Sequence, residues 1–167
     1  MIYRVQHTLP FGTVCIESDG TYITSVTYGT GDTTETCPVI EQCISQLEEY
    51  AVGQRLQFTV PYLMQGTAFQ QSVWSALTDI PYGQTRTYGE IAAQIEQPKA
   101  ARAVGNACNK NPLLLLVPCH RVVGSDGRLT GFAAGLHIKA ALLNLEQTHH
   151  TNLVNHRKRD AYETTIE

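Results

Sequence analysis

The sequence predicts an α+β protein, in which a small N-terminal α/β domain (a sheet plus one helix) precedes a mostly helical C-terminal domain with a helix-turn-helix. Three observations carry this prediction. Short runs rich in β-branched and aromatic residues, bounded by turn residues, occupy the start of the 167-residue chain. Apolar residues recur at helical spacing over residues 38–51 and again after residue 68. Two short helical segments then follow one another across a brief turn.

The N-terminal domain is expected over residues 1–60. Strands are predicted at 2–6, 13–18 and 22–28. Asp19-Gly20 marks a tight turn between the second and third strands. A helix is predicted over 38–51, with Gly53 as its stop signal. Residues 57–60 can return as a further strand before Pro61.

The C-terminal domain is expected over residues 68–147, after a linker at 61–67. Its first helix is indicated by an apolar stripe made of Phe69, Val73, Leu77 and Ile80. Thr87 and Glu90 have the spacing of a capping box, which opens a second helix that ends near residue 96. Pro98 suits the first turn of a third helix over 99–110. The tight turn between the last two helices predicts helix-turn-helix geometry.

Beyond these helices the chain carries a buried run, a cysteine block and a last helix. Leu113 to Val117 are all apolar, which predicts a core strand leading into Pro118-Cys119-His120-Arg121. The last helix is expected from about residue 136 to 146. Residues 148–167 show no clear periodicity and are expected to form a flexible tail.

Composition favours a soluble globular protein with free thiols. The chain is 43% apolar and 16% charged, which is too apolar for a disordered protein. Its five cysteines form no CxxC pair and match no zinc-site spacing, so we expect no metal. No run is long enough to span a membrane, and Met1 to Pro10 lacks the features of a leader peptide. A cytoplasmic location is expected, or a nuclear one if the source is eukaryotic.

The formal net charge of −3 is unevenly distributed along the chain. Residues 1–68 hold two Lys or Arg against seven Asp or Glu, whereas residues 69–146 hold seven against five. Any nucleic-acid face is therefore expected in the second half, with a shallow dependence of affinity on salt.

Cys119 is the candidate nucleophile. A cysteine attacks as its thiolate, and an ordinary thiol is only slightly ionised at neutral pH, so it needs activation. His120 follows it and can act as a base, more readily through one water than directly, because adjacent side chains of an extended segment point apart. Glu146 can orient His120. The Cys-His pair alone favours the alternative that Cys119 is an ordinary buried cysteine.

Several blocks between residues 66 and 146 change that balance. They are Gly66-Thr67-Ala68-Phe69-Gln70-Gln71-Ser72-Val73-Trp74, Ile80-Pro81-Tyr82-Gly83, Thr87-Tyr88-Gly89-Glu90-Ile91-Ala92, Pro98-Lys99-Ala100-Ala101-Arg102-Ala103-Val104-Gly105, Asn111-Pro112, Pro118-Cys119-His120-Arg121-Val122, and Gly131-Phe132-Ala133-Ala134-Gly135-Leu136 with Lys139. Together they closely resemble the O6-alkylguanine-DNA alkyltransferases. The resemblance implies a DNA-repair protein that transfers an alkyl group from O6 of guanine, or O4 of thymine, to Cys119 and is consumed. It implies no metal or cofactor.

The resemblance also implies how DNA is held. The partner is double-stranded DNA with alkylated bases, bound through the minor groove by a monomer that rotates the damaged base out of the stack. Arg102 is expected to fill the vacated space. Tyr88 is expected to crowd the neighbouring phosphate and to bond to N3 of the rotated base. Small residues allow close approach to the groove: Ala100, Ala101, Ala103 and Gly105.

For the base pocket, the resemblance implies that the carbonyls of Cys119 and Val122 bind the exocyclic amine of guanine. The backbone N–H of Ala133 is expected to meet O6. Asn111 is expected to brace the active-site turn through its amide. Phe132, Ala134 and Lys139 complete the pocket.

One departure from the family pattern concerns substrate range. Ala134 stands where members usually carry a glycine, and its methyl group predicts weaker handling of bulky adducts. Two other functions remain open: a nonreactive lesion sensor, against which the presence of Cys119 argues, and a cysteine hydrolase using Cys119, His120 and Glu146. The hydrolase would leave Arg102 and Tyr88 unexplained.

Overall fold

Three antiparallel strands open the chain and lie in the order β1-β2-β3. They are β1 (Tyr3–Leu9), β2 (Gly12–Ser18) and β3 (Ile23–Tyr28). The computed structural model describes residues 1–132 and 134–150. Asp19 closes the second turn, because its carboxylate accepts hydrogen bonds from the backbone N–H groups of Thr21 and Tyr22. The three predicted strands are confirmed, although β1 runs three residues past its predicted end, and Asp19 and Gly20 lie in the connection between β2 and β3 as expected.

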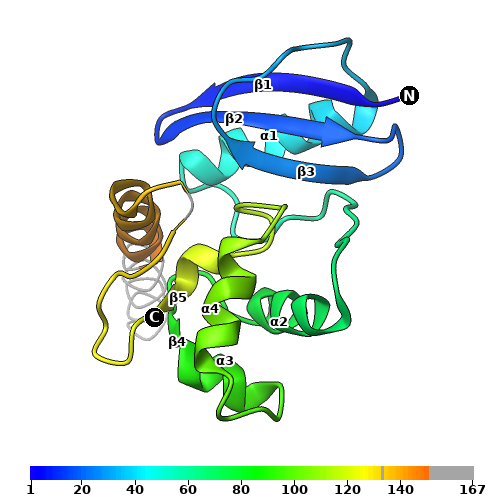
Figure 1. The fold of residues 1–167 in the computed structure, drawn as a ribbon. Helices are drawn as coiled ribbons and strands as arrows, with labels where there is room; N and C mark the ends of the chain where they lie inside the picture. Colours follow the sequence, from blue (N-terminus) through cyan, green and yellow to red (C-terminus); the bar gives the residue numbers. More distant parts are fainter. Residues whose placement is uncertain (133, 151–167) are drawn as a thin grey trace, which may run out of the picture.

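Helix α1 (Pro38–Ala51) packs across all three strands and lies behind the sheet in Figure 1. Proline at its first turn and the apolar positions recognised in the sequence explain its start and its orientation. Ile40, Cys43, Leu47 and Tyr50 are fully buried. The face of α1 toward the sheet therefore forms the core of the N-terminal layer, which consists of β1, β2, β3 and α1.

The outer edge of β3 is paired with two later segments. Ile23 exchanges backbone hydrogen bonds with Pro61 and Leu63, and Val26 with Pro112 and Leu114. The predicted strand at 57–60 is wrong: the Gln46 side chain accepts from the N–H groups of residues 59 and 60 and replaces a strand partner there. Pairing of the edge ties the sheet to the helical half below it in Figure 1.

The helical half begins with α2 (Ala68–Thr78), followed by β4 (Arg86–Thr87), α3 (Tyr88–Gln94) and α4 (Ala101–Asn109). The capping box predicted at Thr87 and Glu90 is present, and Thr67 with Gln70 forms a second one. Helix α4 starts two residues later than expected. Glu96 takes a left-handed conformation (φ 63°) and the Gln97 N–H returns to Ala92, so Pro98 lies in the connecting turn.

Leu113 to Val117 are buried as expected, but the prediction of a core strand is wrong. The Val117 N–H bonds to the Leu113 carbonyl, and Leu115 has φ 73°, so the segment is a tight turn with isolated bridges. It leads into the 3-10 turn η1 (Cys119–Arg121) and β5 (Val122–Val123), which pairs in parallel with β4.

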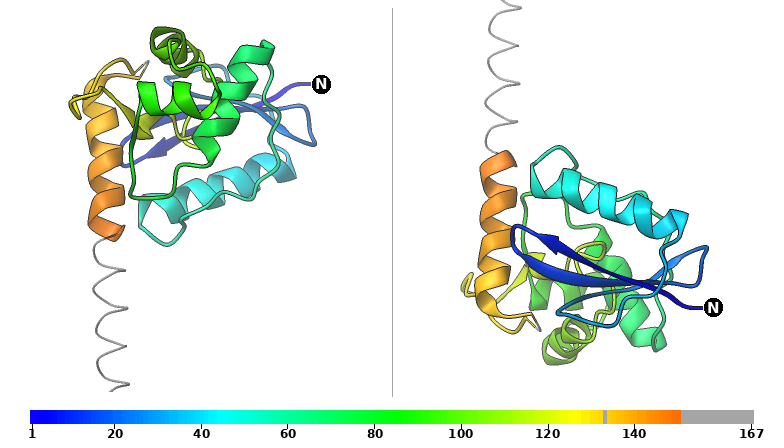
Figure 2. Two further views of the ribbon diagram at one scale, coloured as in Figure 1. Left: turned by 90° about the horizontal axis from the view of Figure 1, so that it is seen from below. Right: turned by 90° about the horizontal axis from the view of Figure 1, so that it is seen from above.

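A last helix covers residues 136–150, continuing past the end expected near Glu146. Figure 2 shows it standing beside the sheet and α1, with its axis crossing that of α1. The expected tail from 151 onward lies outside the described residues. In residues 1–132 and 134–150 no helix has the length and apolar character required to cross a membrane.

Candidate active site

Cys119 lies at the start of the η1 turn and is only 3% exposed. Its backbone N–H bonds to the Val117 carbonyl at 2.8 Å. Asn111 holds the preceding turn from both sides, since its side-chain N–H donates to the Val117 carbonyl and its oxygen accepts from the Leu113 N–H, both at 2.9 Å. The thiol thus follows a buried turn that these hydrogen bonds hold in place.

The environment of Cys119 favours the neutral thiol. Burial raises the pKa of Cys119 to about 11, although Asn111 and the ammonium of Lys139 act in the opposite direction. Lys139 is fully buried, and burial lowers its own pKa. Reaction at neutral pH therefore requires a base that removes the proton during the step.

The residue after Cys119, His120, forms a buried pair with Glu146. The distance from His120 Nε2 to Glu146 Oε2 is 2.6 Å, and each side chain is only 1% exposed. The structure therefore brings together the histidine and the carboxylate that the sequence predicted, 26 residues apart in the chain.

Glu146 accepts further hydrogen bonds that the sequence did not predict. Arg121 donates from Nε to Oε1 at 2.8 Å and from a terminal nitrogen to Oε2 at 3.1 Å. Tyr50 donates its hydroxyl to Oε2 at 2.6 Å, and the Gly83 N–H reaches Oε1 at 3.3 Å. His120 and Arg121 hold the pKa of Glu146 well below its usual range despite its burial.

The tautomer of His120 follows from this arrangement. Glu146 is ionised and can only accept, so Nε2 of His120 carries the proton. Burial lowers the pKa of His120, and Arg121 and Lys139 act in the same direction against Glu146. Nδ1 is buried and has no hydrogen-bond partner in the described part of the chain. It is therefore a free lone pair on a neutral, oriented imidazole.

Tyr88 and Lys139 meet at one carbonyl. The Tyr88 hydroxyl and the Lys139 ammonium each donate to the Thr130 carbonyl at 2.9 Å, and the ammonium lies 5.8 Å from the centre of the Tyr88 ring. Burial raises the pKa of Tyr88, so the phenol stays protonated at neutral pH. Thr130 was not predicted, because its contribution is a backbone atom.

A cavity of about 520 Å³ opens beside Tyr88, between α3, α4 and the loop near residue 130. Arg102 lines this cavity and is exposed. Ala103 and several neighbours on α4 are exposed as well. Ala101 and Gly105 line it as well, while Ala100 is the N-cap of α4. Most of the predicted DNA-contacting residues thus share one open face.

The loop after this cavity carries the remaining predicted residues. Phe132 stacks edge-on against Tyr28 of β3, with ring centres 6.5 Å apart. Val122 is fully buried, and Ala134 is partly exposed. Ala133 lies outside the described residues.

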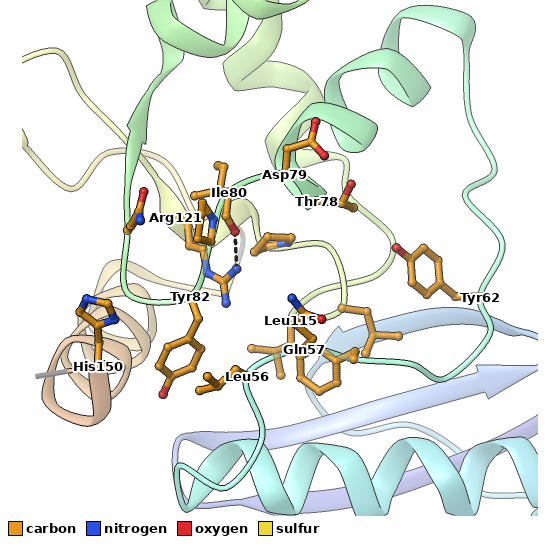
Figure 3. Close-up of a pocket in the computed structure, with 15 residues that line it drawn as sticks. Leu56, Gln57, Tyr62, Thr78, Asp79, Ile80, Tyr82, Leu115, Arg121 and His150 are labelled. Carbon is orange, nitrogen blue, oxygen red and sulfur yellow. Dashed lines mark hydrogen bonds between the residues drawn. The ribbon is translucent and has the colours of Figure 1, made fainter. Parts of the chain in front are cut away.

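A larger cavity, of about 590 Å³, lies next to the cysteine turn (Figure 3). It is lined by Pro118 and Arg121, and Figure 3 shows the hydrogen bond from Arg121 to the Ile80 carbonyl, 2.7 Å long. Tyr88 is absent from its lining, and Cys119 lines neither this cavity nor the smaller one. Size alone would therefore select the cavity that lacks Tyr88 and Arg102. Among the described residues, no group of three or more His, Cys, Asp or Glu is placed to hold a metal.

Comparison with known proteins places this geometry in a family. The family model described as "6-O-methylguanine DNA methyltransferase, DNA binding domain" matches residues 68–148. The methylated-DNA--protein-cysteine methyltransferase of Methanosarcina acetivorans is 59% identical over 101 residues, which are 60% of this chain and 65% of that protein. The corresponding Mycobacterium tuberculosis protein is 53% identical over 105 residues, 63% of this chain and 64% of its own length. The chain thus spans a little under two thirds of these relatives.

Solved structures cover more of the chain. The crystal structure of Mycobacterium tuberculosis O6-methylguanine methyltransferase has a TM-score of 0.83 at 40% identity, over 89% of this chain and 94% of that one. The structure of Mycobacterium tuberculosis OGT in complex with DNA has a TM-score of 0.81 at 41% identity, over 86% and 92%. On this evidence the chain belongs to the O6-methylguanine-DNA methyltransferase family.

Proposed function

We propose that this protein repairs DNA by moving an alkyl group from O6 of guanine, and from O4 of thymine, to its own Cys119. The observation that carries the proposal is the buried series of Cys119, His120 and Glu146, in which the thiol is neutral and the base is neutral and oriented. A relative with 41% identity over most of the chain was crystallised with DNA, which supports DNA as the partner.

Activation of the thiol begins at His120. Its free Nδ1 takes the Cys119 proton through one bridging water, and the imidazolium that forms is stabilised by Glu146 at 2.6 Å. The thiolate exists only while the proton is on His120, because burial disfavours it otherwise. Asn111 keeps the turn, and thus the sulfur, in place.

DNA is engaged by the exposed face that holds Arg102. In this proposal α3 and α4 form a helix-turn-helix that enters the minor groove, and the domain for binding and transfer spans residues 68–147. The damaged base rotates out, Arg102 takes its place in the stack, and the small residues of α4 permit close approach. Their open position beside the Tyr88 cavity supports this assignment.

In the transfer step the Cys119 sulfur attacks the alkyl carbon as the carbon–oxygen bond breaks. The electron pair of that bond leaves with the base, whose negative charge is offset by the Tyr88 hydroxyl at N3. The proton taken from the thiol returns to the base through His120 and solvent, so atoms and charge balance. The thioether that forms on Cys119 is not readily cleaved, so each molecule acts once. We propose that it does so as a monomer and without a cofactor.

Intact-mass measurement after incubation with a duplex that carries one O6-methylguanine tests the proposal. We expect each molecule to gain the mass of one methyl group and no more, even with excess DNA. Cys119→Ser should gain nothing, whereas Cys15→Ser, at a cysteine in the N-terminal sheet, should react like the unmodified protein. A parallel duplex with O4-methylthymine tests the second substrate.

The other outcomes identify other functions. Binding of the damaged duplex without a mass change would mean a lesion sensor. If the protein neither binds the damaged duplex nor gains mass, any role on alkylated DNA is contradicted. The cysteine hydrolase would then be the remaining function.

A further inference from the structure

Tyr50 reaches the active site from the N-terminal layer. It lies on α1, is fully buried, and donates its hydroxyl to Oε2 of Glu146 at 2.6 Å. The same oxygen lies 2.6 Å from His120 Nε2. The two donors therefore share one carboxylate oxygen, although Tyr50 and Glu146 are 96 residues apart in the chain.

The Tyr50 ring is held by aromatic neighbours. Its centre lies 6.2 Å from Phe11, 5.5 Å from Phe58 and 6.1 Å from Tyr82. Burial and the adjacent carboxylate raise the pKa of Tyr50 well above its usual value, so the hydroxyl stays protonated and acts as a donor. A rigid ring with a permanent donor fixes one rotamer of Glu146.

The charges around His120 show what this donor does. Glu146 favours a proton on His120, whereas Arg121 and Lys139 disfavour it. Tyr82 also lies within the electrostatic reach of Glu146 and Arg121. A hydrogen bond from Tyr50 neutralises part of the charge on Oε2, so the carboxylate attracts a proton on His120 less strongly. Loss of the bond would tip His120 toward its charged form, which has no lone pair at Nδ1.

We propose that Tyr50 is a positioning residue for the transfer reaction, one that holds Glu146 against His120 and keeps Nδ1 free to accept the thiol proton. The inference rests on the proposed function, and it makes the chemistry of the C-terminal domain depend on a side chain of the N-terminal layer.

Tyr50→Phe tests it, because the ring and its packing stay while the hydroxyl is lost. The midpoint of the His120 titration, followed by NMR of histidine-labelled protein, should rise by about one pH unit. The acid limb of the single-turnover rate profile should move upward by the same amount as the His120 midpoint, and the rate at pH 8.5 should change little.

Tyr62→Phe is the matched control. It makes the same change at a half-buried tyrosine outside the Glu146 network, and should move neither the titration nor the rate profile. In a Glu146→Gln background, Tyr50→Phe should have much less effect on the rate, because its route of action is gone.

The outcomes separate this proposal from the proposed function. An unchanged His120 midpoint in Tyr50→Phe overturns the role of Tyr50, even if transfer proceeds. A shifted midpoint with an unchanged rate profile overturns its role in transfer. If the unmodified protein transfers no methyl group, the proposed function fails and the NMR result alone decides whether Tyr50 controls His120. If the variant does not fold, the unmodified protein still decides: a bonded Tyr50 hydroxyl gives a slowly exchanging proton signal, and its absence contradicts the proposal.

Discussion

Glu146 concentrates the hydrogen bonds of the site in one carboxylate. It accepts from His120, Tyr50, Arg121 and the Gly83 backbone while only 1% exposed. The negative charge of Glu146 is already balanced by the permanent positive charge of Arg121. The pair is therefore neutral without a proton on His120. The local charge balance thus explains how a histidine in contact with a carboxylate can remain a neutral base.

Glu146→Gln tests that balance at the residue scale. The amide has nearly the same shape but leaves Arg121 buried without a counter-ion, so we expect a loss of about 3 kcal/mol in the free energy of unfolding, measured with urea. Methyl transfer should slow at least tenfold, since the imidazolium loses its stabilising charge. Glu48→Gln, on the largely exposed partner of His7, should change neither quantity. Equal stability of the two variants would contradict the assigned charge balance.

Ala134→Gly tests the predicted limit on adduct size. The substitution removes the methyl group that distinguishes this loop from the usual family pattern, so self-transfer from O6-benzylguanine should accelerate while transfer from O6-methylguanine stays nearly constant. The ratio of the two rates is the measurement, because a general change in loop stability would affect both. Unchanged benzyl transfer in the variant would rule out Ala134 as the cause of any size limit.

At the scale of elements, the N-terminus of α3 sets the place of Tyr88. Thr87 caps the helix and Tyr88 is its first residue. Thr87→Ala should cost about 1 kcal/mol in the free energy of unfolding. It should also slow transfer, because Tyr88 is no longer held in place by the capped first turn of α3. Thr67→Ala removes the same capping box from α2 and should cost a similar amount of stability. The transfer rate of folded Thr67→Ala should equal that of the unmodified protein. Equal slowing in both variants would contradict a special role for the start of α3.

Elements with local signals were the ones that the sequence predicted well. The α3 capping box and the proline start of α1 are short-range features, and both elements begin where expected. The Leu113–Val117 turn was mistaken for a strand because its apolar composition reports burial and not conformation, and a leucine with φ 73° has no local signature. The 57–60 segment failed for a related reason, since Gln46 satisfies its backbone from a distance.

The candidate site follows the same division. Cys119, His120 and Asn111 are close in the chain, and Glu146 followed from the end of a recognisable helix. Tyr50 could not be found in this way, because its approach to Glu146 depends on how α1 packs against the later half. Arg121 stood inside a recognised motif, but nothing local indicated that its guanidinium turns to Glu146.

For the whole molecule, Glu146 is a point where three distant segments meet. Tyr50 comes from α1, His120 and Arg121 from η1, and Gly83 from the turn after α2. The paired edge of β3 joins the same halves a second time through Val26. Unfolding of either half therefore breaks buried polar contacts of the other, which favours a single cooperative transition.

That junction predicts how stability depends on pH. The pKa of His120 is lowered by burial, so the folded state binds this proton less readily than the unfolded chain and stability begins to fall as the pH drops below about 6.5. The pKa of Glu146 is lowered by His120 and Arg121, so a second loss, of about 2 kcal/mol, should follow as the pH drops below about 4.5. Urea unfolding between pH 8 and pH 3 measures both.

In Glu146→Gln the second loss should disappear, because glutamine does not titrate, and the variant should approach the unmodified protein in stability at the acid end. Curves for the two proteins that stay parallel down to pH 3 would show that the depressed pKa of Glu146 does not link these segments to folding. Coincident fluorescence and circular dichroism transitions at each pH would establish that the two halves unfold together, which this linkage requires.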